Sequence, residues 1–204
     1  MVGFVGLALS DPEPDEPDGR RRRSQDSRSR IVSAMVEIVR EGDISPSAAE
    51  VATRAGVGLR SVFRHFKDME SLYREMTDVI ETDLRAMSAQ PFKGVTWRER
   101  VLELIDRRSV GFDQIAPIRR ASDARRHTSA VLQDDHDRMT VGLREILRMQ
   151  LPRGAVDRPT FAALELLLSY EAWNRLRTDQ GLGAGEARKT LRVAVKALIG
   201  DGEA

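Results

Sequence analysis

The segment AAEVATRAGVGLRSVFRHFKD, residues 48–68, decides the fold of this chain. Its first half is built from small residues, and Ala52 stands four positions before Gly56. Two short helices that cross tightly need a small residue where they meet, and the turn between them needs a residue that tolerates positive φ. Val62 would face back into the pair. Ala52, Gly56 and Val62 therefore have the spacing of a helix-turn-helix.

The second half of this segment differs from the first in carrying most of the basic residues. The outward positions of its helix mix polar and apolar side chains, and they are Gly58, Leu59, Arg60, Ser61, Phe63 and Arg64. A helix that enters the major groove of DNA presents such a surface. An ordinary helical hairpin is the alternative.

Positive charge is concentrated around the same segment, although the whole chain has a net charge of only +1. Residues 20–67 hold eleven Lys and Arg against five Asp and Glu, whereas residues 1–19 hold five acids and no base. Residues 68–204 hold twenty-two of each. Clustered Lys and Arg are typical of proteins that bind a phosphate backbone, and a solvated basic surface is the alternative on charge alone.

The rest of the chain has helical patterning. Apolar residues recur at spacings of three and four, and capping boxes at Ser47–Glu50 and Thr96–Glu99 begin two helices. No alternating run of β-branched residues predicts a strand. We therefore predict an all-α chain of nine helices. Besides the two at 48–68, they cover residues 29–41, 70–87, 96–112, 117–126, 129–150, 159–178 and 185–199.

Composition narrows the class of protein further. The 204 residues include no cysteine, so disulfides and thiolate metal sites are excluded and a cytoplasmic location is expected. No segment has the roughly 18 consecutive apolar residues that a membrane span requires. Residues 1–27 offer little to bury and are expected to form a disordered leader. The arginine run at 20–23 would either lie in a DNA minor groove or stay solvated.

Catalytic motifs are absent from the sequence. It has no G-x-S-x-G, S-x-x-K, H-E-x-x-H or phosphate-binding loop. The glycine-rich stretch at 181–185 follows a helix, which favours a plain loop. The run QDDHDR at 133–138 points its charges in different directions on a helix, and a solvated face is the interpretation. We expect no enzyme, no cofactor and no metal.

The extended segment AGVGLRSVFRHFKDMESLYREM, residues 55–76, resembles TetR-type transcriptional regulators. Their usual form runs A-G-V-S-x-x-T-L-Y-x-H-F-x-x-K-x-x-L, and the resemblance covers about residues 28–200. It departs at Gly58 (usually Ser or Thr), Phe63 (commonly Tyr) and Met69 (frequently Lys). The positions in register are Ala55, Gly56, Val57, Ser61, Phe63, His65, Phe66 and Leu72.

The resemblance implies a three-helix helix-turn-helix DNA-binding domain at 28–74 and a helical ligand-binding and dimerisation domain at 75–200. It implies a ligand-responsive regulator, expected to be a repressor, that binds a pseudo-palindromic double-stranded operator. Leu59 and Arg60 would read base edges, and most of the others would contact the backbone. The full expected DNA-binding set is Ser47, Leu59, Arg60, Ser61, Phe63, Arg64, His65 and Lys67.

The helical remainder is larger than DNA binding alone requires, which favours a sensor of a small, largely apolar effector. The resemblance implies that the last two helices pair in a homodimer, and the candidates for the seam are Leu164, Leu168, Leu191, Val195 and Leu198. The expected ligand-binding residues are Met76, Ile80, Leu104, Phe112, Met139, Leu143, Tyr170, Trp173 and Asn174. The alternative is a DNA-binding protein without an effector, either architectural or a constitutive regulator.

Overall fold

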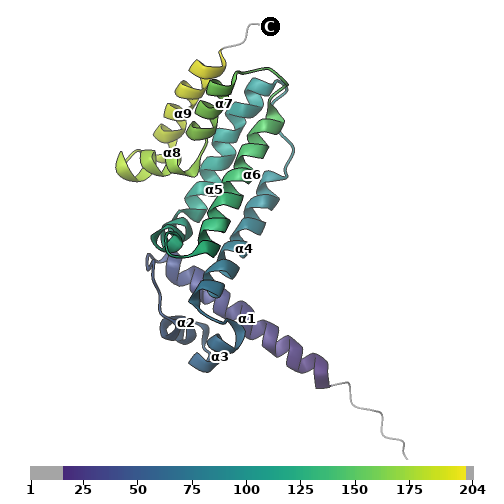
Figure 1. Ribbon diagram of the computed structural model, residues 1–204, viewed down its shortest axis with the longest axis vertical. Coiled ribbons are helices and arrows are strands. Elements are labelled where there is room, and N and C mark those ends of the chain that lie inside the picture. The colour runs from purple at the N-terminus through teal and green to yellow at the C-terminus, as the bar shows by residue number, and fades with distance from the viewer. Residues whose placement is uncertain (1–15, 201–204) are drawn as a thin grey trace, which may run out of the picture.

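The computed structural model describes residues 16–200 (Figure 1). Nine α-helices and one π-helical segment make up this range, which contains no strand, so the predicted all-α class and helix count are confirmed. The elements are α1 (Glu16–Arg40), α2 (Ala48–Ala55), α3 (Leu59–His65), α4 (Met69–Ser88), α5 (Trp97–Arg126), α6 (Ala130–Gln150), α7 (Arg158–Leu167), α8 (Tyr170–Asn174), η1 (Arg175–Asp179) and α9 (Ala184–Ile199).

The molecule is elongated, with a head of helices α1–α3 at one end (Figure 1). Helices α4, α5 and α6 run lengthwise, and α7–α9 lie at the far end with the C-terminus. Both α4 and α5 pack against α1, so the head is joined to the body by packed helices. The expected boundary near residue 74 falls inside α4, a helix that belongs to both parts.

The helix-turn-helix forms because each end of α2 carries a local signal. The Ser47 hydroxyl accepts the Glu50 N–H at 3.2 Å, while the Glu50 carboxylate accepts the Ser47 N–H at 2.8 Å. At the other end Gly56 is left-handed with φ 62°, and the Val57 N–H donates to the Ala52 carbonyl at 3.0 Å. This glycine-terminated Schellman arrangement sets the direction in which α3 departs.

Helix α1 is longer than predicted. Residues 16–27, expected to be disordered, form its first turns, and the rest of the expected leader, residues 1–15, lies outside the described range. Pro17 is tolerated because first-turn N–H groups have no helical partner. The buried stripe of residues 31–39 supplies the nucleus, and the arginine-rich turns before it extend a helix that has already formed.

Helix α5 differs from a second expectation, because the sequence predicted two helices, 96–112 and 117–126, with a break between them. It continues through Pro117, although an internal proline removes one N–H donor and costs about 3 kcal/mol in an isolated helix. Twelve residues of α5 are buried, among them Leu104, Phe112 and Ile118, so packing outweighs the local penalty. Because α5 contacts α1, α4, α6, α8 and α9, it forms the central axis of the body.

The helix predicted at 159–178 is interrupted instead. Leu168 leaves helical geometry, and the Ser169 hydroxyl caps the new helix α8. The buried side chain of Arg108 enters this break and donates to the carbonyl oxygens of Leu168 and Leu143 at 2.6 Å each. Burial lowers the pKa of Arg108 to about 10. One arginine thus ties together α5, α6 and the α7–α8 junction.

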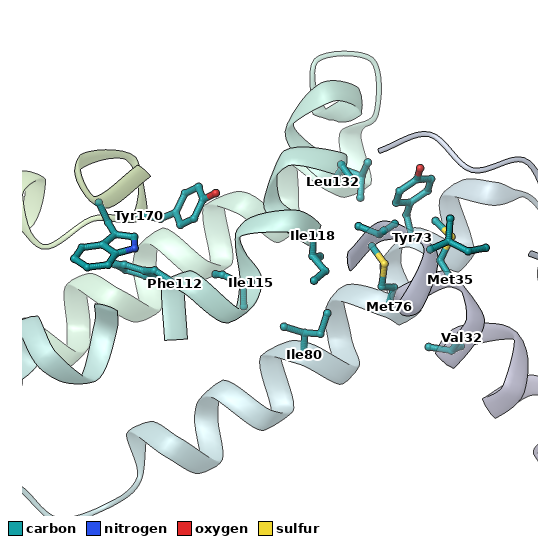
Figure 2. Close-up of a cluster of buried hydrophobic side chains, with 14 of the residues drawn as sticks. Val32, Met35, Tyr73, Met76, Ile80, Phe112, Ile115, Ile118, Leu132 and Tyr170 are labelled. Atoms are coloured by element: carbon teal, nitrogen blue, oxygen red, sulfur yellow. The ribbon is translucent and has the colours of Figure 1, made fainter. Parts of the chain in front are cut away.

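The buried core is continuous from head to body (Figure 2). Figure 2 shows Met35 of α1 near Tyr73 and Met76 of α4, which in turn lead towards Ile80 and Ile118 in the body. All five side chains are at most 8% exposed. A rearrangement in the body can therefore be transmitted to the head through packed side chains.

Candidate nucleic-acid interface and internal cavity

The outer face of α3 combines exposed apolar and basic side chains. Leu59 is 47% exposed and Phe63 is 50% exposed, while Val62 between them is 1% exposed and faces the core. Arg60 and Arg64 are exposed on the same helix. This is the mixed outward surface that the sequence predicted. Gly58 begins the helix without a side-chain cap, as the departure from the family pattern implies.

The remaining expected contacts lie at the edges of this face. Ser47 and Lys67 are exposed, and Ser61 is half-buried. His65 is also half-buried, and its Nε2 is enclosed without a hydrogen-bond partner. Burial, followed by the charges of Arg64 and Arg28, lowers the pKa of His65, which favours the neutral ring.

Arg28 of α1 links the end of α3 to α4. Its Nε and Nη2 donate to the two Glu75 carboxylate oxygens at 3.1 and 2.8 Å, and its Nη1 donates to the His65 carbonyl at 2.7 Å. The guanidinium carbon also lies 4.4 Å from the Phe66 ring centroid. One face and the N–H edges of a single guanidinium group are therefore used to hold the end of α3 against α4.

The turn between α5 and α6 also touches the head, in an arrangement named here the head clasp, residues 125–129. Arg125 donates to the Ser45 hydroxyl just before α2, and its guanidinium carbon lies 4.9 Å from the Tyr73 ring centroid. Ser129 donates to Glu70 at the start of α4. The clasp thus contacts both the loop before α2 and the helix after α3.

A cavity of about 30 Å³ lies between α4, α5 and α6. One part of its wall is apolar, formed by Ile80, Ile115, Ile118, Leu132 and Met139. The other part is polar, formed by Thr77, Arg119, Ser122, Asp123, Asp135 and His136. The volume suits one or two water molecules, so a larger molecule would have to enlarge the cavity.

The expected ligand-binding residues separate into two groups. Ile80 and Met139 line the cavity. The others do not: they pack in the core or at its margin, and they are Met76, Leu104, Phe112, Leu143, Tyr170, Trp173 and Asn174. The Phe112 and Tyr170 rings meet edge to face at 5.7 Å, and Trp173 Nε1 donates to Asp113 at 2.9 Å. These contacts belong to packing between α5 and α8.

The polar part of the cavity centres on Arg119, whose side chain is 9% exposed. Its Nη2 donates to His136 Nδ1 at 2.6 Å and lies 3.6 Å from Asp123 and 3.5 Å from Glu171. Since an arginine can only donate, Nδ1 must be the acceptor nitrogen of a neutral imidazole. Burial, followed by the charges of Arg119 and Arg126, lowers the pKa of His136, which also favours the neutral imidazole.

Asp135 faces Arg119 across the cavity from α6, and its side chain is 5% exposed. One carboxylate oxygen accepts from Arg138, while burial raises the pKa of the group. Asp135 and His136 belong to the run 133–138, for which the sequence predicted a solvated face. That expectation was wrong for these two residues, because Asp135 continues the apolar stripe that includes Leu132 and Met139.

Most of the polar cavity residues were not predicted from the sequence, and the reason is the same for each. Arg119, Ser122 and Asp135 occupy positions that helical periodicity assigns to the buried side of α5 and α6, and all three are buried. A polar residue on an apolar stripe was the available signal. The signal does not by itself say which opposing helix supplies the partner.

No family model and no curated protein sequence matches this chain. Solved structures do match it. A TetR transcriptional regulator from Rhodococcus sp. RHA1 has a TM-score of 0.57 and 19% identity, covering 92% of this chain and 98% of its own. A TetR-family regulator from Streptomyces coelicolor has a TM-score of 0.64 and 16% identity, covering 85% and 80%.

The multidrug-binding protein EbrR, solved in complex with imidazole, matches over 98% of this chain and 100% of its own, with a TM-score of 0.61 and 18% identity. The chain therefore has the fold of TetR-family transcriptional regulators, as the sequence resemblance implied. No helix within residues 16–200 combines the length and apolar character needed to cross a membrane.

Proposed function

We propose that this protein is a ligand-responsive transcriptional repressor of the TetR type. In this proposal it binds a pseudo-palindromic DNA operator in the cytoplasm as a homodimer, and a small molecule that is largely apolar releases it. Residues 28–74 would bind DNA, and residues 75–200 would sense the effector and form the dimer. The observation that carries the proposal is a basic helix, α3, in a head that packs against a body with a cavity between α4, α5 and α6.

DNA binding is supported by the surface of α3. Exposed Leu59 and Phe63 offer apolar contacts for thymine methyl groups, and Arg60 has the length and bidentate donors that suit a guanine edge. Lys67 lies just beyond the helix, where it would pair with a phosphate. Ser47 caps the N-terminus of α2, a second place where backbone N–H groups favour phosphate oxygens.

Dimer formation is supported by an apolar face on α7 and α9, helices that pack against each other. Leu166 is 65% exposed, Val193 is 64% exposed and Leu198 is 36% exposed. Exposed apolar side chains on two packed helices suit two-fold pairing as a four-helix bundle. The structure corrects most of the expected seam, because Leu164, Leu168, Leu191 and Val195 are at most 5% exposed and belong to the core.

Effector release is supported by the position of the cavity beside the head clasp. Ser122 lies one turn before Arg125, and Leu132 lies one turn after Ser129. An effector that enlarged the cavity would move these turns, together with Ile80 on α4, and would shift the head through the clasp. A coupling free energy of about 1–3 kcal/mol is typical of such regulators and would be sufficient for release.

The proposal is tested by selecting DNA sites from a random duplex library and measuring affinities by fluorescence anisotropy. We expect enrichment of an inverted repeat whose half-sites are separated by about one helical turn or somewhat more. A library of varied small molecules should then include compounds that lower the affinity for that site. Binding without any sequence enrichment and without any small-molecule effect would instead favour an architectural protein.

A further inference from the structure

Resting on the proposed function, we infer that the effector carries a neutral head group that both donates and accepts hydrogen bonds, such as a primary amide or lactam. Several polar atoms at the cavity are unpaired. Arg119 Nε, the Ser122 hydroxyl and one carboxylate oxygen of Asp135 are all buried without a hydrogen-bond partner, and all three residues line the same cavity. Buried polar atoms are nearly always paired, so these three atoms and Asp123 Oδ1, a fourth such atom in the same cavity wall, indicate a polar occupant.

The types of these atoms define what the occupant must offer. Arg119 Nε can only donate, the carboxylate oxygen of Asp135 accepts, and the Ser122 hydroxyl can do either. A carbonyl oxygen would satisfy Arg119 and Ser122, and an adjacent N–H would satisfy Asp135. An amide combines this acceptor oxygen and this N–H donor in one small group, whose size also suits the short distances in a cavity of about 30 Å³.

The charges around the cavity favour a neutral head group over an ion. Arg119 is already neutralised by nearby Asp123 and Glu171, at 3.6 and 3.5 Å, and Asp135 is paired with Arg138. A carboxylate would be placed beside Asp123 and Asp135, and an ammonium group would be placed beside Arg119. Either ion would lose its hydration without gaining an uncompensated opposite charge.

The apolar wall accommodates the rest of such a molecule. Ile80, Ile118 and Leu132 approach one another from α4, α5 and the start of α6 (Figure 2). Met139 completes this side and is half-buried, and its unbranched, flexible chain can move to enlarge the space. A largely apolar body with one amide end therefore fits the division of the cavity into two parts.

The experiment compares four probes that share a benzene ring and differ in the attached group: benzamide, benzoate, benzylamine and toluene. Binding to the full chain is measured by calorimetry and by NMR of the Ile80 and Met139 methyl groups. We expect benzamide to bind at least tenfold more tightly than the other three and to shift both methyl signals. Arg119→Met should reduce benzamide affinity about tenfold and leave toluene unchanged, whereas Arg120→Met, on its exposed neighbour, should change neither.

If Arg119→Met does not fold, Ser122→Ala removes only a hydroxyl and should still weaken benzamide selectively. The inference is overturned if toluene or either ion binds as tightly as benzamide, if the two methyl signals do not move, or if no probe binds and ordered water alone fills the cavity. Operator affinity is measured separately. Benzamide bound without DNA release would count against the proposed function alone, and release by a molecule bound elsewhere would count against this inference alone.

Discussion

At the scale of single residues, the side chains of the proposed recognition helix α3 differ in exposure, and the exposure of each side chain indicates its role. Val62 is buried and fixes the helix against the head, whereas Leu59 and Phe63 are half in water and free to meet a partner. His65 takes an intermediate place, because its ring is half-buried and its carbonyl is held by Arg28. The charged residues among the expected DNA contacts, Arg60, Arg64 and Lys67, are all exposed.

Arg60 and Lys67 should therefore differ in how they affect DNA binding. Arg60→Ala is expected to cost about 1–3 kcal/mol at the preferred site and to relax preference at one base pair, because a base-edge contact is lost. Lys67→Ala should weaken all sequences alike and reduce the dependence on salt, because a phosphate contact is lost. Anisotropy titrations against the selected site and single-base variants, at several salt concentrations, distinguish the two. Equal sequence preference in wild type and Arg60→Ala would refute the reading role.

At the scale of elements, the α5–α6 turn has more than a connecting role. Ser129 caps α6 by accepting the Leu132 N–H and also donates to Glu70, so one hydroxyl links a cavity helix to the start of α4. Arg125 reaches the loop before α2 from the end of α5. The clasp therefore joins two elements of the cavity to two elements that position α3.

Removing one contact of the clasp should loosen the head. Arg125→Ala deletes the donor to Ser45 and the cation–π contact with Tyr73, and it is expected to lower stability by about 1 kcal/mol. Amide hydrogen exchange in residues 41–47 should become faster, because that loop loses its contact with the body. Arg120→Ala is the matched control, since Arg120 is exposed on the same helix. Unchanged exchange in Arg125→Ala would show that the clasp does not hold the loop.

At the scale of the whole molecule, the head and helices α7 and α9 lie at opposite ends of a long axis (Figure 1). Pairing through the far end would leave both recognition helices at the near end. The separation of the two heads would then depend on how α4, α5 and α6 pack along that axis. Small changes at the cavity would therefore alter the separation of the two heads, which must match the spacing of the two half-sites.

A charged residue introduced among the exposed apolar side chains of α7 and α9 should prevent the two protomers from pairing. Val193→Glu is expected to convert the dimer to monomer at micromolar concentration, because pairing would bury an unpaired carboxylate on each protomer. Operator affinity should fall at least tenfold, since two half-sites are no longer bound together. Val141→Glu is the control, on an α6 valine of similar exposure, 53% against 64%. Light scattering reports the mass, and a dimeric Val193→Glu would rule out this face as the seam.

The local signals in the sequence were sufficient for the helix-turn-helix of α2 and α3. Ser47, Gly56 and the small residue Ala52 act through hydrogen bonds and backbone geometry within a few positions, so their effect can be read without knowing the rest of the fold. The all-α class follows from periodicity in the same way. Recognition of the TetR-type pattern also depended on this segment, which is why it anticipated the fold of the solved structures.

Tertiary packing decided what local signals could not. Pro117 favours a break in the helix, but the burial of α5 outweighs this local preference. The predicted helix 159–178 is interrupted where Arg108 donates a hydrogen bond to the Leu168 carbonyl oxygen. The cavity depended on packing even more strongly, because Arg119 and Asp135 come from different helices and are brought together only when α5 and α6 pack. Periodicity assigns a side chain to the inside, but only the assembled helices determine which other buried groups it meets.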